Sequence, residues 1–160
     1  MYFDRIDYHH ASAYEPYMQK FQKDEEELTE TDMDVIEYYA GNHIGFFLTW
    51  IIQHQFEGEL LKEIANEDLQ AVRNETMSGI EFFIKNCDGK FTEEDVSEEI
   101  FPFVNAYYER YYLTDYGLWV IDGLKEVPFG FIGIWENYHD FEYTIDHAYQ
   151  DYKDQKLYLN

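Results

Sequence analysis

The stretch "GNHIGFFLTWIIQHQF", residues 41–56, is the least polar part of the chain, and it decides the fold. Apolar and histidine side chains recur there at alternating spacings of three and four, which is typical of a helix. This row comprises Ile36, Ala40, His43, Phe47, Trp50 and His54. The neighbouring row comprises Ile44, Leu48 and Ile51. Because this helix is apolar over most of its circumference, we expect it to lie at the centre of the core.

The same stretch is too short to cross a membrane. Its longest apolar run, residues 44–52, is interrupted by Gly45 and Thr49 and falls well short of the roughly 20 residues of a bilayer span. The first ten residues, "MYFDRIDYHH", have neither the basic nor the apolar segment of a secretory signal. Cys87 is the only cysteine, so no disulfide can form within the chain. We expect a cytoplasmic protein of bacterial type that does not contact a membrane.

The composition indicates one acidic, folded domain. The 160 residues are 46% hydrophobic and 20% aromatic, enough for a single compact domain over residues 1–160 with a proper core. Asp and Glu number 34 against 11 Lys and Arg, a formal charge of −23. Direct nucleic-acid binding needs clustered Lys and Arg, so this charge disfavours it and favours a basic partner. Residues 1–33 should form a less regular, acidic segment, because charges accumulate over residues 23–32.

The rest of the chain reads as mainly helical. We predict further helices over residues 57–65, 77–87, 92–112 and 134–155. Ser78 is the expected N-cap of the second of these, and Asp88-Gly89 its stop. Pro102 lies too far inside the third to belong to its first turn, so we expect a kink or two helices meeting there. Residues 122–133 form an irregular connector that is long enough for a short strand. The predicted fold is a single compact helical domain of about five to six helices around the central apolar helix, with room for one short strand or hairpin.

No pattern in the sequence indicates catalysis or metal binding. His43 and His54 are eleven residues apart, roughly 16 Å along one helix, and cannot share an ion. Glu136 and His139 form one Glu-x-x-His pair, whereas a di-iron bundle needs two such pairs. Cys87 follows an apolar helix beside an acidic residue, as a packed thiol does. We therefore predict no catalytic residue, no metal and no cofactor. The expected structural residues are His43, Gly45, Trp50 and Trp135.

Carboxylates and tyrosines alternate along two predicted helical rows. The outer row of the last helix comprises Glu136, Asp140, Tyr143, His147, Gln150 and Asp154. A second row comprises Glu94, Glu98, Phe101, Asn105, Tyr108 and Tyr112. Tyrosine is enriched at binding hot spots, and carboxylates attract basic partners. The candidate partner-binding residues are Glu94, Glu98, Tyr108, Tyr112, Glu136, Asp140, Tyr143 and Asp154. The alternative interpretation is a solvated acidic face on which the tyrosines cap the core.

The central stretch also resembles a known family. "NHIGFFLTWIIQH", residues 42–54, is similar to the Thr-His-Ile-Gly-Met-Phe-Leu-Ala-Trp signature of small, acidic bacterial proteins that carry a domain of unknown function. Further similar segments follow in order: "CDGKFTEEDV" (87–96), "YYLTDY" (111–116) and "IWENY" (134–138). The resemblance implies that His43 hydrogen-bonds another segment and that Gly45 lets a neighbour approach closely. Relatives begin with an Asp-Asp-Ala-x-Trp-His-like segment where this chain has "HHASAYE" (9–15), so we carry over no N-terminal site.

The family's size and acidity are similar to those of immunity proteins of bacterial toxin systems. We therefore expect a non-enzymatic binding protein, a monomer or homodimer, that neutralises a cognate toxin domain. That toxin would be basic and act on nucleic acid or nucleotides. One alternative is a general nucleic-acid mimic that blocks many basic proteins. Another is a small metal-dependent hydrolytic enzyme that uses His43, Glu136 and His139.

Overall fold

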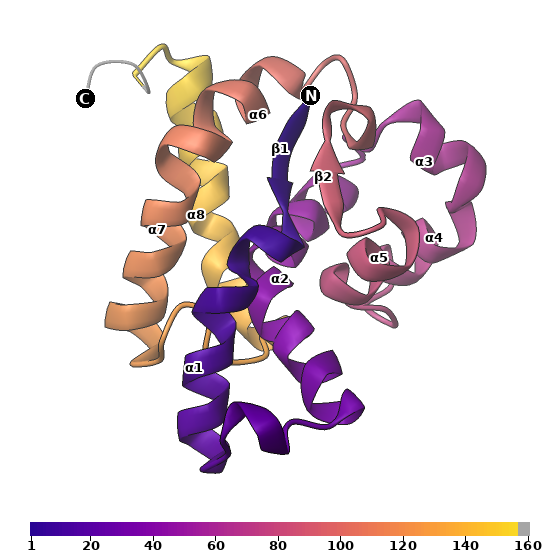
Figure 1. Ribbon diagram of the computed structural model, residues 1–160. Helices are drawn as coiled ribbons and strands as arrows, with labels where there is room; N and C mark the ends of the chain where they lie inside the picture. The colour runs from indigo at the N-terminus through magenta and orange to yellow at the C-terminus, as the bar shows by residue number, and fades with distance from the viewer. Residues whose placement is uncertain (157–160) are drawn as a thin grey trace.

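Helix α2, Glu30–Gln53, lies in the middle of the molecule (Figure 1). The computed structural model describes residues 1–156. Every residue from 39 to 52 is buried, and α2 packs against α1, α4, α5, α8 and the 3₁₀ turn η1. Its first turn is closed by a capping box, in which Thr29 and Asp32 each hydrogen-bond the other's backbone N–H. The prediction of a central apolar helix is confirmed.

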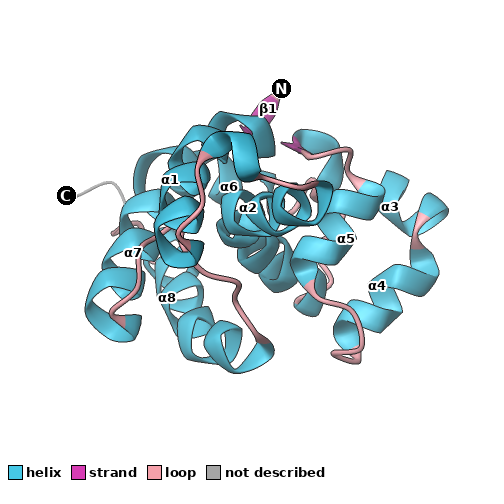
Figure 2. Cartoon of the chain, turned by 60° about the horizontal axis from the view of Figure 1, so that its bottom comes forward, coloured by secondary structure: helices cyan, strands magenta, loops and turns pink. Residues whose placement is uncertain are grey.

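The other elements surround α2 and are mostly short helices (Figure 2). Apart from α2, the elements up to residue 86 are β1 (Tyr2–Arg5), η1 (Ile6–His9), α1 (His10–Phe21), η2 (Glu25–Glu27), α3 (Glu59–Ile64), α4 (Asn66–Arg73) and α5 (Gly79–Asn86). The later ones are β2 (Lys90–Thr92), η3 (Glu93–Asp95), α6 (Phe101–Tyr107), η4 (Tyr108–Tyr112), α7 (Leu113–Leu118), η5 (Trp119–Leu124) and α8 (Trp135–Lys153). Helices make up 71% of this single compact domain, so the mainly-α prediction is confirmed.

The only sheet among residues 1–156 joins the N-terminus to the turn after α5. β1 pairs antiparallel with β2, with Asp4 opposite Phe91 and Arg5 opposite Lys90. A bulge between Tyr2 and Asp4 shifts the register, a device that re-aims a side chain. The connector at residues 122–133, for which the sequence allowed a short strand, holds none. Residues 1–33 also hold β1, η1 and α1 rather than the less regular segment expected from their charge.

The predicted N-cap at Ser78 is confirmed, whereas the predicted position of Pro102 inside a helix is wrong. Ser78 caps α5 by accepting a hydrogen bond from the Glu81 N–H, and Gly89 follows with a φ of +67°. Pro102, in contrast, does lie in the first turn of a helix, α6. The chain leaves η3 and turns before α6 begins, so residues 92–112 are not one kinked helix. Since α6 starts at Phe101, the predicted row through Glu94 and Glu98 does not exist as a helical row.

Residues 101–124 run through α6, η4, α7 and η5 as one helical stretch with two π-helical turns, η4 and η5. A buried side chain recurs along it every four residues. This row comprises Val104, Tyr108, Tyr112, Tyr116 and Val120, none more than 1% exposed. Four residues overshoot one α-helical turn by about 40°, so such a row would drift around a regular helix. The wider π turns, with i→i+5 hydrogen bonds, reduce that drift and keep the row against the core.

No helix among residues 1–156 combines the length and the apolar character that a membrane span requires. The apolar face of α2 is covered by protein instead. Its own Phe47 and Trp50 are fully buried, and Phe103 of α6 packs against both. This agrees with the prediction that the central stretch is a core helix.

Gly45 allows α2 and α5 to touch. A Cβ built at Gly45 would lie 2.7 Å from the backbone N and 2.8 Å from the Cα of Ile80. Both of these are atoms of the first turn of α5, which cannot rotate away as a side chain can. The close approach expected from the sequence is therefore present at this position.

We expect Gly45→Ala to lower the free energy of unfolding by about 1–3 kcal/mol, because the added methyl group overpacks a tight contact. The matched control is Gly117→Ala in α7, where a built Cβ meets nothing within 4 Å. There the same change should leave stability equal or raise it by up to about 1 kcal/mol. Urea denaturation followed by circular dichroism measures both. Equal effects at the two positions would contradict the packing role of Gly45.

Candidate functional site

The outer face of α8 is acidic and exposed, as predicted. Glu136, Asp140, Tyr143 and Asp154 all lie at the surface, with Tyr143 68% exposed. The helix carries five acidic residues against one lysine, Lys153. One of these carboxylates is held in place, since the Trp119 indole N–H donates to Asp140 Oδ2 at 2.8 Å.

The second predicted binding row divides between surface and core. Glu94 and Glu98 are exposed, but they lie in η3 and in the turn before α6. Tyr108 and Tyr112 are 1% and 0% exposed, so a partner cannot reach them in this fold. Their hydroxyl groups donate inward instead: Tyr112 to the His43 carbonyl at 2.5 Å, and Tyr108 to Asp4. We therefore remove both tyrosines from the candidate binding set. The role of the remaining residues stays a prediction.

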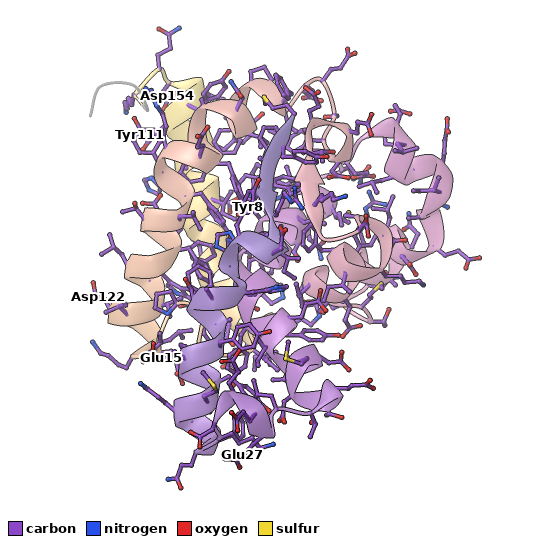
Figure 3. The ribbon with its side chains drawn as sticks, in the orientation of Figure 1. Tyr8, Glu15, Glu27, Tyr111, Asp122 and Asp154 are labelled. Carbon is purple, nitrogen blue, oxygen red and sulfur yellow. The ribbon has the colours of Figure 1, made fainter. Side chains whose placement is uncertain are left out.

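A groove of about 500 Å³ lies between α8 and the helical stretch of residues 101–124. It is lined by Tyr107, Tyr111, Asp115, Tyr143, Thr144, His147, Ala148 and Asp151. The Tyr107 hydroxyl donates to Asp115 Oδ2 at 2.6 Å, which fixes one carboxylate in the lining. Figure 3 shows that Tyr111, which lines the groove, lies toward the end of the molecule opposite Glu27. The groove thus offers aromatic rings and carboxylates to the same ligand.

A second, buried cluster joins the N-terminus to the core. The Asp4 carboxylate accepts from Tyr108 at Oδ2 (2.9 Å) and from the Arg5 backbone N–H at Oδ1 (2.8 Å). His9 Nε2 lies 2.7 Å from Oδ1, and His43 Nε2 lies 3.0 Å from Oδ2. These side chains come from β1, η1, α2 and η4. Asp4 is therefore the point at which four separate segments meet.

Electrostatics favour an ionised Asp4 and a neutral His43. Burial by itself raises the pKa of Asp4, but hydrogen bonds from His43 and His9 outweigh it and hold that pKa well below its usual range. Burial lowers the pKa of His43, against the opposing effect of the Asp4 charge. His43 Nδ1 is buried and has no hydrogen-bond partner among the described residues. Its proton therefore belongs on Nε2, which donates to Asp4.

The residues proposed for an enzyme do not come together. Within residues 1–156, Asp4, His9 and His43 form the only group of three or more His, Cys, Asp or Glu close enough to share a metal ion. His139 pairs with Glu75 instead, and that hydrogen bond raises its pKa. The His43–Glu136–His139 site of the enzyme hypothesis is therefore absent from this part of the chain.

The other residues named in the sequence analysis make contacts that support the fold. Trp50 is fully buried, and its indole N–H donates to Asp146 Oδ1 at 2.7 Å. The His54 ring packs at a tilt against Trp50, and its Nδ1 donates to the Trp50 carbonyl at 2.8 Å. Trp135 is only half-buried and packs edge-on against Tyr138. Burial raises the pKa of the Cys87 thiol well above its usual range, so this cysteine is a poor nucleophile.

Sequence reasoning missed the part that Asp4, His9 and Tyr108 play. The sequence patterns predicted no role for Asp4 or His9, and they placed Tyr108 on an outer row. A signal existed in the alternation of the first residues, because Asp4 and Ile6 are both buried and two positions apart. An acid on the buried face of a strand requires partners, and histidines were available nearby.

We expect Tyr108→Phe to lower the free energy of unfolding by about 1.5–3 kcal/mol, because an ionised, buried carboxylate loses one of its donors. The matched control is Tyr143→Phe, the same loss of one hydroxyl group at a position that is 68% exposed. That change should stay within about 0.5 kcal/mol of the unmodified protein. Denaturant titration at pH 7 compares the two. A cost at Tyr108 no larger than at Tyr143 would contradict the anchoring role of Asp4.

The lowered pKa of Asp4 predicts a specific acid sensitivity. The unfolded chain takes up this proton below about pH 4, before the folded protein does. Below that pH, folding stability should fall by about 1.4 kcal/mol per pH unit from this group alone. Asp4→Asn removes the titration, so its stability should change less steeply between pH 4 and pH 2.5. Parallel slopes for the two proteins would show that Asp4 is not ionised in the fold.

The fold and site can now be compared with known proteins. Residues 2–128 match the family described as "Domain of unknown function (DUF7832)". No curated protein and no solved structure matches the chain. The matched region begins at residue 2, so it includes Asp4 and His9, although we had carried no N-terminal site over from relatives. It also contains α2 and all of residues 101–124. The chain belongs to the DUF7832 family.

Proposed function

We propose that this chain is a non-enzymatic, acidic binding protein that uses the outer face of α8 and the adjoining groove to bind a basic protein. The observation that carries the proposal is the groove itself, in which tyrosine rings and carboxylates line one space of about 500 Å³. An arginine or lysine side chain fits such a lining, because its charge pairs with a carboxylate while its stem or guanidinium plane packs on an aromatic ring.

The charge of the whole chain supports this choice of partner. With 34 acidic residues and 11 basic ones, most carboxylates have no basic residue to pair with. Such a field raises the association rate of a positively charged protein and repels nucleic acid. We infer further that the partner is a cognate toxin domain, in the cytoplasm of a bacterium. The acidity and small size that the chain has in common with immunity proteins support this narrower proposal.

Affinity capture at low salt tests the proposal. The tagged full chain serves as bait in a lysate of cells that encode it, and retained proteins are identified by mass spectrometry. We expect one basic protein in stoichiometric amount, released as salt rises, since surface charge pairs are screened. Retention of many unrelated basic proteins would instead support the nucleic-acid mimic, and an empty capture would contradict both binding functions.

Charge-neutralised variants then test the α8 face that adjoins the groove. Glu136→Gln, Asp140→Asn and Asp154→Asn together remove three negative charges from the α8 face. We expect at least a tenfold rise in Kd, a change of about 1.4 kcal/mol or more. The matched control is Glu25→Gln, Glu26→Gln and Glu27→Gln, which removes three exposed charges from η2, at the end of the molecule opposite Asp154 (Figure 3). Titration calorimetry measures both. Equal losses in the two triple variants would mean that total charge, and not the α8 face, determines binding.

A further inference from the structure

The Asp4 cluster has the composition of a metal site as well as that of a structural anchor. Asp4, His9 and His43 each offer one ligand atom, and these atoms lie within 4.8 Å of one another. Two imidazole nitrogens and one carboxylate are a common ligand set for divalent first-row metals. We propose that Asp4, His9 and His43 bind one such ion, with Zn²⁺ the ion that suits them best.

The distances are compatible with an ion. Zinc ligands lie 2.0–2.2 Å from the metal, so two ligand atoms of a tetrahedral shell are about 3.4 Å apart. Here His9 Nε2 is 2.7 Å and His43 Nε2 3.0 Å from the oxygens of Asp4. Shifts of well under 1 Å at each pair would therefore open the shell. The ion then takes the place of the hydrogen bonds that link the two imidazoles to the carboxylate, with each imidazole presenting an Nε2 without a proton and carrying its proton on Nδ1.

The cluster also lacks a cationic side chain. Among residues 1–156, none of the groups that hydrogen-bond the Asp4 carboxylate is a Lys or Arg side chain. The buried Asp4 carboxylate therefore gives the cluster a negative charge, which a divalent cation neutralises. His43 exchanges its Nε2 proton for the metal by moving that proton to Nδ1.

The surroundings hold the ligands in place and leave one route for an ion. Phe129 stacks on the His9 ring at 5.2 Å and meets the His43 ring edge-on at 5.3 Å. The Tyr108 hydroxyl orients the carboxylate from the opposite helical stretch. His43 is completely buried, but the His9 side chain is 13% exposed and follows Tyr8, which lies at the surface (Figure 3). An ion therefore enters past His9.

An ion in this position acts on the fold. It adds a bond from β1 and η1 to α2 beside the existing packing and hydrogen bonds, and it binds the folded chain better than the unfolded one. Such binding raises stability with metal concentration. This metal site is independent of the proposed basic partner: it is buried and binds a metal ion, whereas the α8 face is exposed and binds a protein.

The test begins with the full chain, freed of metal by a chelator. Zn²⁺ is titrated by calorimetry in excess Mg²⁺, which occupies the exposed carboxylates. We expect one Zn²⁺ per chain, and a melting temperature about 5–10 °C higher when free Zn²⁺ reaches 100 times Kd. No saturable binding under these conditions would overturn the proposal.

Matched histidine variants locate the ion. His9→Gln changes the most exposed ligand, and we expect at least a tenfold loss of Zn²⁺ affinity. The control is His139→Gln, which removes another histidine that contacts carboxylates, Glu75 and Glu142, outside the cluster. It should bind Zn²⁺ as the unmodified chain does. Unchanged affinity in His9→Gln, or an equal loss in both variants, would overturn the assignment.

A spectroscopic measurement on the unmodified chain avoids any question of variant folding. Cu²⁺ bound at the cluster should show nitrogen hyperfine coupling from two imidazoles by electron paramagnetic resonance. Coupling from no imidazole, or from one alone, would place the ion elsewhere and overturn the proposal.

Discussion

Residues 39–52 of α2 are buried on every side, so neighbouring segments must cover them all round, and polar atoms buried there cost free energy unless they are hydrogen-bonded. α2 imposes this requirement on the rest of the fold. Asn42 donates to the Tyr116 hydroxyl at 2.8 Å and accepts from the Gly133 N–H at 2.9 Å. Thr49 donates to the Gly45 carbonyl at 2.6 Å, and His43 reaches Asp4. An unpaired polar group in such an interior costs on the order of 1–3 kcal/mol, so these contacts specify which segments may lie beside α2.

Three buried tyrosines supply hydrogen-bond partners of this kind. Tyrosine supplies a large apolar ring together with one hydroxyl group, which must find a partner when buried. Tyr108, Tyr112 and Tyr116 each hydrogen-bond a group of β1 or α2. Their rings fill the core while their hydroxyls satisfy its polar atoms. The exposed carboxylates act in the opposite way, since a charge of −23 strains the compact state by repulsion. The dense aromatic interior offsets that repulsion.

The parts of the fold that depend on neighbouring residues were predictable, and the parts that depend on distant ones were not. The three-and-four spacing around Phe47 predicted α2, and Ser78 predicted the start of α5, because both signals act within one or two turns. The outer row of α8 followed from the same periodicity. The hydrogen bond of Tyr108 could not be predicted from its own row, because the carboxylate that accepts it, Asp4, lies 104 residues away in β1. The same holds for Asp4 and His43, which are 39 residues apart and meet only once α2 has been packed. Pro102 was misplaced since the turn that precedes α6 has no strong signal of its own.

The π-helical turns have a consequence for how this helical stretch tolerates change in length. A π turn is equivalent to one residue inserted into an α-helix, with the extra residue accommodated by a wider hydrogen-bonded loop. Residues 101–124 contain two such turns, η4 and η5. The stretch therefore already accommodates the equivalent of two inserted residues. Loss of one residue there can be absorbed by closing a π turn into an ordinary α-helical one, so that the residues beyond it need not rotate away from the core. Among the helices of this fold, this is where evolution can vary the length of the chain while keeping its architecture.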